Sequence, residues 1–225
     1  MMQRVPEPEL MDDAAQARAY AEADFAEAHD AFVRLYLERF GAAPDGWVLD
    51  LGCGPGDVTL RFARACPQVR VHGVDGAAAM LRLGTAAVEA AGLGERVTLL
   101  QGHLPGASLP RPRYDAVISN SLLHHLAEPG VLWASARRFG APGAPLFVMD
   151  LLRPADPAEL EALVARYAAD APPVLRRDFA ASLAAAYRVD EVRAQLAAAG
   201  LAGFTVEAVS DRHWVAWGRL PEAAS

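Results

Sequence analysis

The sequence contains no lysine: all 21 basic residues among its 225 positions are arginine. Without a lysine amine the protein cannot form a pyridoxal Schiff base or act as a lysine-based aldolase, and it has no P-loop lysine for a nucleotide phosphate. The 28 acidic residues outnumber the arginines and give a net charge of -7 and a pI near 5.4. This balance argues against a broad surface for nucleic acid or anionic lipid. We expect a small-molecule partner, no nucleic acid and no membrane.

Cysteine and long apolar runs are also scarce. The two cysteines, Cys53 and Cys66, cannot build a disulfide framework, and neither has a CxxC partner or a histidine at zinc spacing. We therefore expect no metal site and a reducing, cytoplasmic setting. Residues 1–10 carry prolines and glutamates where a signal peptide needs an apolar core, and no run of about 18 apolar residues occurs. The sequence thus predicts neither export nor a membrane span.

The remaining composition, with 53% hydrophobic and 22% charged residues, is typical of one soluble domain. From residue 47 onward, short β-branched or leucine runs alternate with amphipathic stretches, which is the βαβα rhythm of a parallel sheet covered on both faces. Glycines are placed to end two of the intervening helices. The expected strands are 47–51, 71–74, 97–100, 116–119 and 146–149, and the expected helices between them are 56–65, 77–91 and 129–139, closed by Gly92 and Gly140.

Helices are also expected before the sheet begins. Asp13 stands where a helix N-terminus favours a side-chain acceptor, and aromatic residues such as Phe32 and Tyr36 follow at roughly helical spacing. This pattern predicts one or two helices over 13–40. We interpret residues 1–40 as an N-terminal helical lid or extension.

Beyond residue 150 the βαβα rhythm stops. A helical pair broken by two prolines follows, and then come a capped helix and two short strands separated by a tight turn. We interpret residues 41–225 as one domain that carries a helical insert over 154–188. The expected elements are helices 156–170, 175–187 and 190–199, and hairpin strands 204–209 and 213–217.

The chemically informative string is Val-Leu-Asp-Leu-Gly-Cys-Gly-Pro-Gly-Asp over residues 48–57. A predicted strand there ends in an acid and passes directly into alternating glycines before a helix. Glycine lets a ligand approach the backbone, and the helix start offers free N–H groups. A dinucleotide site needs GxGxxG spacing, whereas the spacing here is GxGxG and Asp57 would face the pyrophosphate. The loop therefore argues against a dinucleotide site.

This loop resembles motif I of the class I S-adenosylmethionine-dependent methyltransferases. Asp75, at the end of the second expected strand, resembles the family acid that grips both ribose hydroxyls, and a carboxylate does offer two acceptor oxygens to a diol. Gly76 and Met80 stand where the family lays apolar surface on the adenine. His103 departs from the family pattern, which has an acid there to bind the adenine amine.

The resemblance covers residues 46–150 and, with weaker motifs, 189–219. It implies an α/β, Rossmann-like, doubly wound sheet of seven strands, mostly parallel, with an antiparallel strand in a C-terminal hairpin. The string over 114–126 is similar to the fourth-strand segment of small-molecule members, and residues 120–123 lack the Asn/Asp-Pro-Pro-aromatic string of enzymes that methylate bases. The expected cofactor-binding residues are Tyr20, Asp50, Gly52, Cys53, Gly54, Asp75, Gly76, Met80, Gly102, His103, Leu104 and Asn120.

The implied reaction is transfer of a methyl group from S-adenosylmethionine to a small-molecule acceptor by in-line SN2 displacement, with S-adenosylhomocysteine as product. The protein must hold the nucleophile in line at about 3 Å and, for some acceptors, remove a proton. The candidate catalytic residues are His124, Asp150 and His213, although each also suits a packing or capping role. Arginines in a lid would suit a carboxylate or phosphate on the acceptor. The expected substrate residues are Asp24, His125, Arg176, Arg177, Tyr187 and Arg212.

Several points stay open in the sequence. The acceptor atom can be oxygen, nitrogen, sulfur or carbon, and the protein can be a monomer or a homodimer. A non-catalytic S-adenosylmethionine-binding regulator or partner subunit would share the same fold. A nicotinamide oxidoreductase would share the glycine loop.

Overall fold

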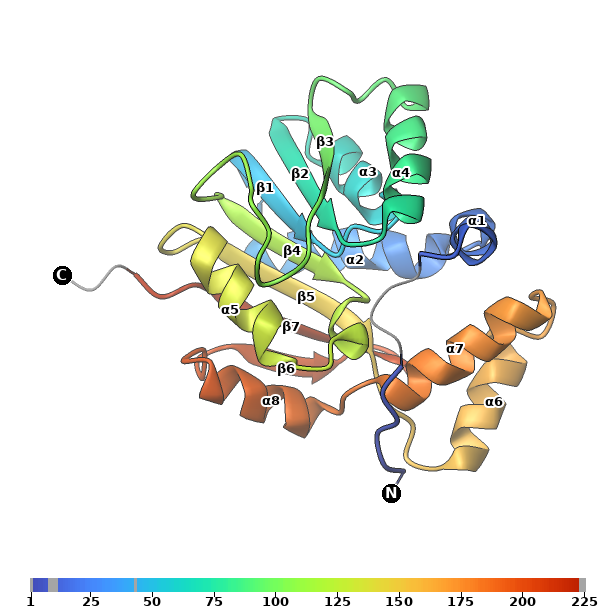
Figure 1. The fold of residues 1–225 in the computed structure, drawn as a ribbon. Helices are drawn as coiled ribbons and strands as arrows, with labels where there is room; N and C mark the ends of the chain where they lie inside the picture. The colour runs from blue at the N-terminus through green and yellow to red at the C-terminus, as the bar shows by residue number, and fades with distance from the viewer. Residues whose placement is uncertain (1, 8–11, 43, 223–225) are drawn as a thin grey trace.

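Seven strands form a single sheet in the order β3-β2-β1-β4-β5-β7-β6, as the computed structural model shows for residues 2–7, 12–42 and 44–222 (Figure 1). Parallel pairing joins the first five strands of this order, and β7 runs antiparallel to both β5 and β6. The predicted fold class is confirmed. The strands are Gly46–Leu51 (β1), Val69–Asp75 (β2), Val97–Gln101 (β3), Ala116–Asn120 (β4), Pro145–Leu151 (β5), Thr205–Ala208 (β6) and His213–Arg219 (β7).

Helices cover both faces of the sheet because alternate strand residues point to opposite sides. Val48 belongs to the core under α2 and α3, whereas the next residue, Leu49, belongs to the core under α5 and α8. The helices are Ala14–Glu22 (α1), Ala26–Phe40 (α2), Asp57–Ala65 (α3), Ala78–Ala90 (α4), Gly130–Phe139 (α5), Pro157–Tyr167 (α6), Pro173–Ala185 (α7) and Val189–Ala198 (α8), with a 3-10 turn at Leu123–His125 (η1).

The two N-terminal helices have different surroundings. On α2, Phe32 and Tyr36 are fully buried and meet Phe147 of β5 edge-on, so this helix is part of the core. In contrast, α1 lies between α4 and α7: Asp12 accepts a hydrogen bond from the N–H of Ala79 at 2.9 Å, and α1 also contacts α7. Residues 1 and 8–11 of the predicted 1–40 extension, and residues 43 and 223–225 of the predicted 41–225 domain, lie outside the described residues.

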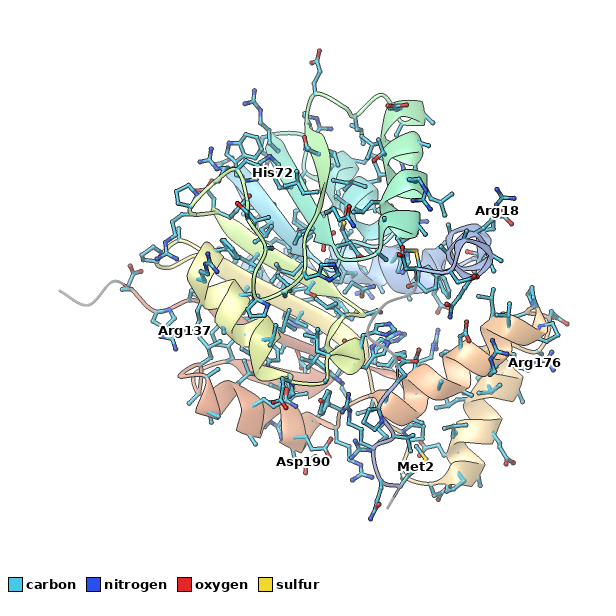
Figure 2. The ribbon with its side chains drawn as sticks, viewed as in Figure 1. Met2, Arg18, His72, Arg137, Arg176 and Asp190 are labelled. Carbon is cyan, nitrogen blue, oxygen red and sulfur yellow. The ribbon has the colours of Figure 1, made fainter. Side chains whose placement is uncertain are left out.

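The N-terminal segment 2–7 lies beside the insert, although the two are far apart in the sequence (Figures 1 and 2). The N–H of Met2 donates to the carbonyl of Ala155 at 2.7 Å, and the N–H of Val5 donates to that of Ala184 at 3.0 Å. We call residues 2–7 the strap. These backbone hydrogen bonds hold the strap to both ends of the α6–α7 pair, at the residue pair before α6 and at the last turn of α7.

Most predicted boundaries differ from the structure by a few residues, and those of α7 bear on the candidate site. The seventh helix begins at Pro173 rather than at residue 175, because proline suits the first helical position, where its missing N–H costs no hydrogen bond. It ends at Ala185, so Tyr187 is not helical and instead forms a bridge with Leu152. Gly140 does end α5, but with a φ of -72°. Glycine is needed there because no side chain fits: a Cβ would lie 2.1 Å from Leu220 Cδ1.

Among the described residues, no helix is long and apolar enough to span a bilayer. Both cysteines are buried and free.

Candidate active site

The glycine loop joins β1 to α3 and is held against β2. Gly52 and Gly54 have positive φ angles of 73° and 52°, which glycine adopts without strain. A Cβ on Gly52 would lie 2.8 Å from Leu122 Cβ, so no larger residue fits. The N–H groups of Gly52 and Cys53 both donate to the carbonyl of Val74. The loop therefore presents backbone rather than side chains to the cavity at the carboxyl edge of the sheet.

Asp75, the last residue of β2, connects this loop to the start of α4. Its Oδ2 accepts a hydrogen bond from the N–H of Gly54 at 2.8 Å, and its Oδ1 accepts one from Ala77 at 2.8 Å. Burial raises the pKa of Asp75, while these backbone donors act to lower it. Each carboxylate oxygen has a second lone pair, so the group can still accept two hydroxyl donors.

Asp50, near the end of β1, is a buried acid below the loop. It is 1% exposed, and Oγ1 of Thr59 donates to its Oδ2 at 2.5 Å. Burial raises the pKa of Asp50 to about 7, against the smaller opposing effect of the Thr59 hydrogen bond. A cationic ligand group nearby would favour the ionised form of this carboxylate.

All twelve of the predicted cofactor residues line one cavity, which we call the donor cavity. They come from α1 and α4, from the ends of β1, β2 and β4 with the loops that follow β1 and β2, and from the loop after β3, segments that only the fold brings together. Pro55, Ala77 and Ser121 also line it and were not predicted. Ser121 has a φ of 54°, which is uncommon for a residue other than glycine and is often found at functional sites. No sequence signal marks it.

A second cavity of about 520 Å³, which we call the acceptor cavity, adjoins the first. Five residues line both: Tyr20, His29, Asn120, Ser121 and His125. The acceptor cavity extends from this shared wall to α6, α7 and the β6–β7 hairpin. Among the predicted catalytic and substrate residues, those that line it are Asp24, His124, His125, Arg212 and His213.

Three predicted substrate residues do not line either cavity. Arg176 hydrogen-bonds the carbonyls of Ala168 and Ala169 at the end of α6, and Figure 2 shows it at the outer end of the α6–α7 pair. Arg177 has a side chain that is 74% exposed. Tyr187 is covered by the guanidinium of Arg4, 4.3 Å from its ring centroid. The structure therefore does not bring these three residues to the wall of either cavity.

His124 and Asp150 form a buried pair on one side of the acceptor cavity. Nδ1 of His124 hydrogen-bonds Oδ1 of Asp150, and both side chains are almost fully buried. Burial disfavours the charged imidazole, but attraction to Asp150 and Glu7 raises the pKa of His124 overall. Burial likewise acts to raise the pKa of Asp150, but His124 keeps it below its ordinary value.

Glu7 is the functional candidate that sequence reasoning missed. Its Oε1 lies 3.4 Å from Nε2 of His124 and 3.4 Å from Nδ1 of His125, and its side chain is 10% exposed. Burial raises the pKa of Glu7, and attraction to His124 opposes that effect. One glutamate in a polar N-terminal segment carries no signal of this position. It results from hydrogen bonds of the strap to the insert and from the one that Arg4 donates to the carbonyl of His124.

Two other polar pairs complete the walls. Asp57 accepts hydrogen bonds from Nδ1 of His29 at 2.6 Å and from Arg61 at 2.8 Å, and these partners lower the pKa of Asp57 to about 2. Asp57 thus serves an ion-pair cluster at the start of α3. His213 lies 3.1 Å from Oγ of Ser210, and burial, with the charge of Arg212, lowers its pKa to about 4. His213 is therefore a neutral side chain near pH 7.

Comparisons with known proteins show which proteins this chain is similar to. Residues 48–143 match a family model described as a methyltransferase domain. A release factor glutamine methyltransferase of Gloeobacter violaceus is 39% identical over 108 residues, which are 48% of this chain and 37% of that protein. The 27-O-demethylrifamycin SV methyltransferase of Amycolatopsis mediterranei is 28% identical over 175 residues, which are 78% of this chain and 61% of that one. The matched segment covers 37% to 51% of the length of the glutamine methyltransferase and of two further curated relatives, so the chain spans about half of their length or less.

Among solved structures, a SAM-dependent methyltransferase from Aquifex aeolicus superposes with a TM-score of 0.66 at 19% identity, covering 92% of this chain and 98% of that one. The resemblance identified from the sequence is thereby confirmed. Residues 48–143 match the methyltransferase-domain family, and the chain shares the fold of solved S-adenosylmethionine-dependent methyltransferases.

Proposed function

We propose that the chain transfers a methyl group from S-adenosylmethionine to a small-molecule acceptor. The observation that carries this proposal is the pair of adjoining cavities with a common wall of five residues. One cavity is lined by the glycine loop and Asp75, and the other by aromatic and ionisable side chains of α1, α2, η1, α6 and α7. A donor in the first and an acceptor in the second would meet at that wall.

The residues of the donor cavity fit the cofactor. The bare backbone of Gly52 and Gly54 allows close approach, and Asp75 keeps acceptor lone pairs for a ribose diol. Asp50 is a buried acid that a cationic ligand group would ionise. When bound, S-adenosylmethionine supplies a methyl group that its sulfonium charge already activates for in-line displacement, which leaves S-adenosylhomocysteine.

On the acceptor side, we propose that His124 accepts the proton of the nucleophile and that Asp150 positions it. The hydrogen bond from Nδ1 to Asp150 leaves Nε2 as the basic atom and stabilises the imidazolium that forms. Glu7 lies 3.4 Å from this Nε2, so the strap must shift when an acceptor hydroxyl takes that position. Such a base suits an acceptor that carries an ionisable O–H, N–H or S–H group.

The size and enclosure of the acceptor cavity support a small acceptor. About 520 Å³ is typical of a cavity for a drug-sized ligand. Aromatic rings from Tyr20, Phe25 and Phe179 line it together with polar groups. We propose that the strap, α1 and the α6–α7 insert are the parts that close over the acceptor and exclude water. Because α2 is part of the core, the lid within residues 1–40 is limited to the strap and α1.

The test is to incubate the protein with methyl-labelled S-adenosylmethionine and a metabolite extract, then to locate the label by mass spectrometry. The proposal predicts enzyme-dependent label in a low-mass compound, and far less label with Asp75→Ala. Label in a protein or nucleic acid fraction contradicts the small-molecule assignment. Cofactor binding without any labelled product supports a non-catalytic regulator, and binding of NAD instead of S-adenosylmethionine supports an oxidoreductase.

A further inference from the structure

Three side chains converge where the strap crosses η1. Glu7 comes from the strap, and His124 and His125 are consecutive residues of η1. A donor atom from each of the three lies within 4.8 Å of those of the other two. The two imidazole rings face each other with centroids 4.2 Å apart and planes tilted by 36°. Two imidazoles and a carboxylate are a donor set for a divalent transition metal.

The spacing of these atoms fits one shared metal ion better than direct hydrogen bonds. Oε1 of Glu7 is 3.4 Å from a nitrogen of each histidine, and Oε1 receives no hydrogen bond from the described residues. Neutral or charged N–H···O hydrogen bonds are about 2.7–3.2 Å long. Tetrahedral zinc, with Zn–N and Zn–O distances of about 2.0–2.2 Å, separates its ligand atoms by about 3.4 Å. Both measured separations have that value.

Asp150 binds the other ring nitrogen of His124, on the side away from Glu7. Its hydrogen bond to Nδ1 of His124 turns Nε2 and its lone pair toward Glu7. A carboxylate that holds the far nitrogen of a metal-bound histidine in this way fixes the tautomer and strengthens the ligand. The two carboxylates, Asp150 and Glu7, also supply two negative charges to balance a dication, and the guanidinium of Arg4 offsets them only in part.

We propose that Glu7, His124 and His125 bind one divalent transition-metal ion, of which Zn²⁺ is the type best suited to this set, and that the bound ion blocks methyl transfer. Nε2 of His124 cannot hold a metal and accept a proton at the same time. The metal would also tie the strap to η1 and so keep the acceptor cavity closed. Metal binding does not depend on the proposed function, whereas the blocking effect rests on it.

The test is calorimetric titration of the metal-free protein with Zn²⁺, together with the visible spectrum of the Co²⁺ complex. We expect one site with a micromolar or tighter Kd and the intense visible absorption of tetrahedral Co²⁺. Glu7→Gln and His125→Ala should each weaken binding at least tenfold. His103→Gln, which alters a histidine of the donor cavity, should leave metal affinity unchanged. Far-ultraviolet circular dichroism and a cooperative urea unfolding transition like that of the wild-type protein check that Glu7→Gln and His125→Ala fold.

Absence of saturable binding to the wild-type protein overturns the site, as does an affinity that Glu7→Gln and His125→Ala both leave unchanged. Once an acceptor is known, Zn²⁺-loaded protein should bind S-adenosylmethionine yet lose methyl transfer. Full transfer by the loaded protein would overturn the blocking effect while leaving the site itself established. Failure of the proposed function is distinguishable, because metal titration requires neither cofactor nor acceptor.

Discussion

Asp150 holds both the imidazole and the backbone of the turn that carries His124. Its Oδ1 accepts the hydrogen bond from Nδ1 of His124, and its Oδ2 accepts one from the N–H of Leu123 at 2.7 Å. The contact follows from topology, because β4 and β5 are adjacent and parallel and their carboxyl ends meet at one edge of the sheet. One carboxylate thus sets the position of the candidate base.

The first prediction concerns this pair. The pKa of His124 lies above 6.5, so its contribution to stability is present below that pH and is lost as pH rises through the folded-state pKa. The pKa of Asp150 lies below 3.8, so its contribution is present above that pH and is lost in stronger acid. Asp150→Asn should therefore cost about 3–5 kcal/mol near pH 6 and clearly less near pH 9. Urea unfolding at the two pH values measures the difference, and an equal cost at both would contradict the paired charges.

The second prediction concerns Asp75. Asp75→Ala removes the acceptor proposed for the ribose, and a charge-assisted hydrogen bond contributes about 1.5–3 kcal/mol, so the Kd for S-adenosylhomocysteine should rise by about 10- to 150-fold. Asp115→Ala is a matched control, since Asp115 accepts a backbone hydrogen bond from Trp47 at the opposite edge of the sheet. Calorimetry should show unchanged affinity for the control. Equal affinities in the two variants would remove Asp75 from the site.

The third prediction concerns the pH dependence of donor binding. The pKa of Asp50 is about 7, and a cationic ligand group favours its ionised form. Affinity for S-adenosylmethionine should therefore fall by up to about tenfold per pH unit below pH 7. Titrations at pH 5.5 and 7.5 measure this slope. Asp50→Asn should bind more weakly at pH 7.5 and show a much flatter slope, whereas a wild-type affinity that is the same at both pH values would refute the idea.

The fourth prediction concerns Gly52. An alanine there would have to adopt a φ of 73° and place its Cβ 2.8 Å from that of Leu122. We expect Gly52→Ala to lower the free energy of unfolding by at least about 1 kcal/mol and to weaken donor binding. Gly94→Ala is the control, since a Cβ on Gly94 has open space. Similar unfolding midpoints for both variants would contradict the tight approach of the loop to Leu122.

Local patterns in the sequence predicted the sheet, and the residues they mark as cofactor candidates lie in segments that meet at one cavity. The strand-glycine-helix string and the acid that follows β2 lie within short segments, and parallel topology alone brings their ends together. All predicted cofactor residues consequently line one cavity. Gly140 was placed correctly as a helix end, but its cause, close packing against Leu220, depends on a contact that no local pattern contains.

The acceptor side was harder to predict because long-range contacts determine it. Arg176 and Arg177 were expected at the acceptor because they are charged and lie in the insert, yet the helix turns one toward α6 and the other to solvent. Glu7 went unnoticed because the strap is held at η1 by contacts between segments far apart in the sequence. These are its hydrogen bonds to the insert and the one from Arg4 to the carbonyl of His124. The carboxylate partner of His124 could not be predicted either, because Asp150 is 26 residues away in the sequence and contacts His124 only in the folded sheet.

The most direct test of the account is a crystal structure of the protein with S-adenosylhomocysteine. The account predicts the nucleoside between the Gly52–Gly54 loop and Asp75, with both ribose hydroxyls on that carboxylate and the sulfur facing the wall formed by Asn120 and His125. A ligand bound elsewhere, or a donor cavity closed by its own side chains at saturating ligand, would contradict it.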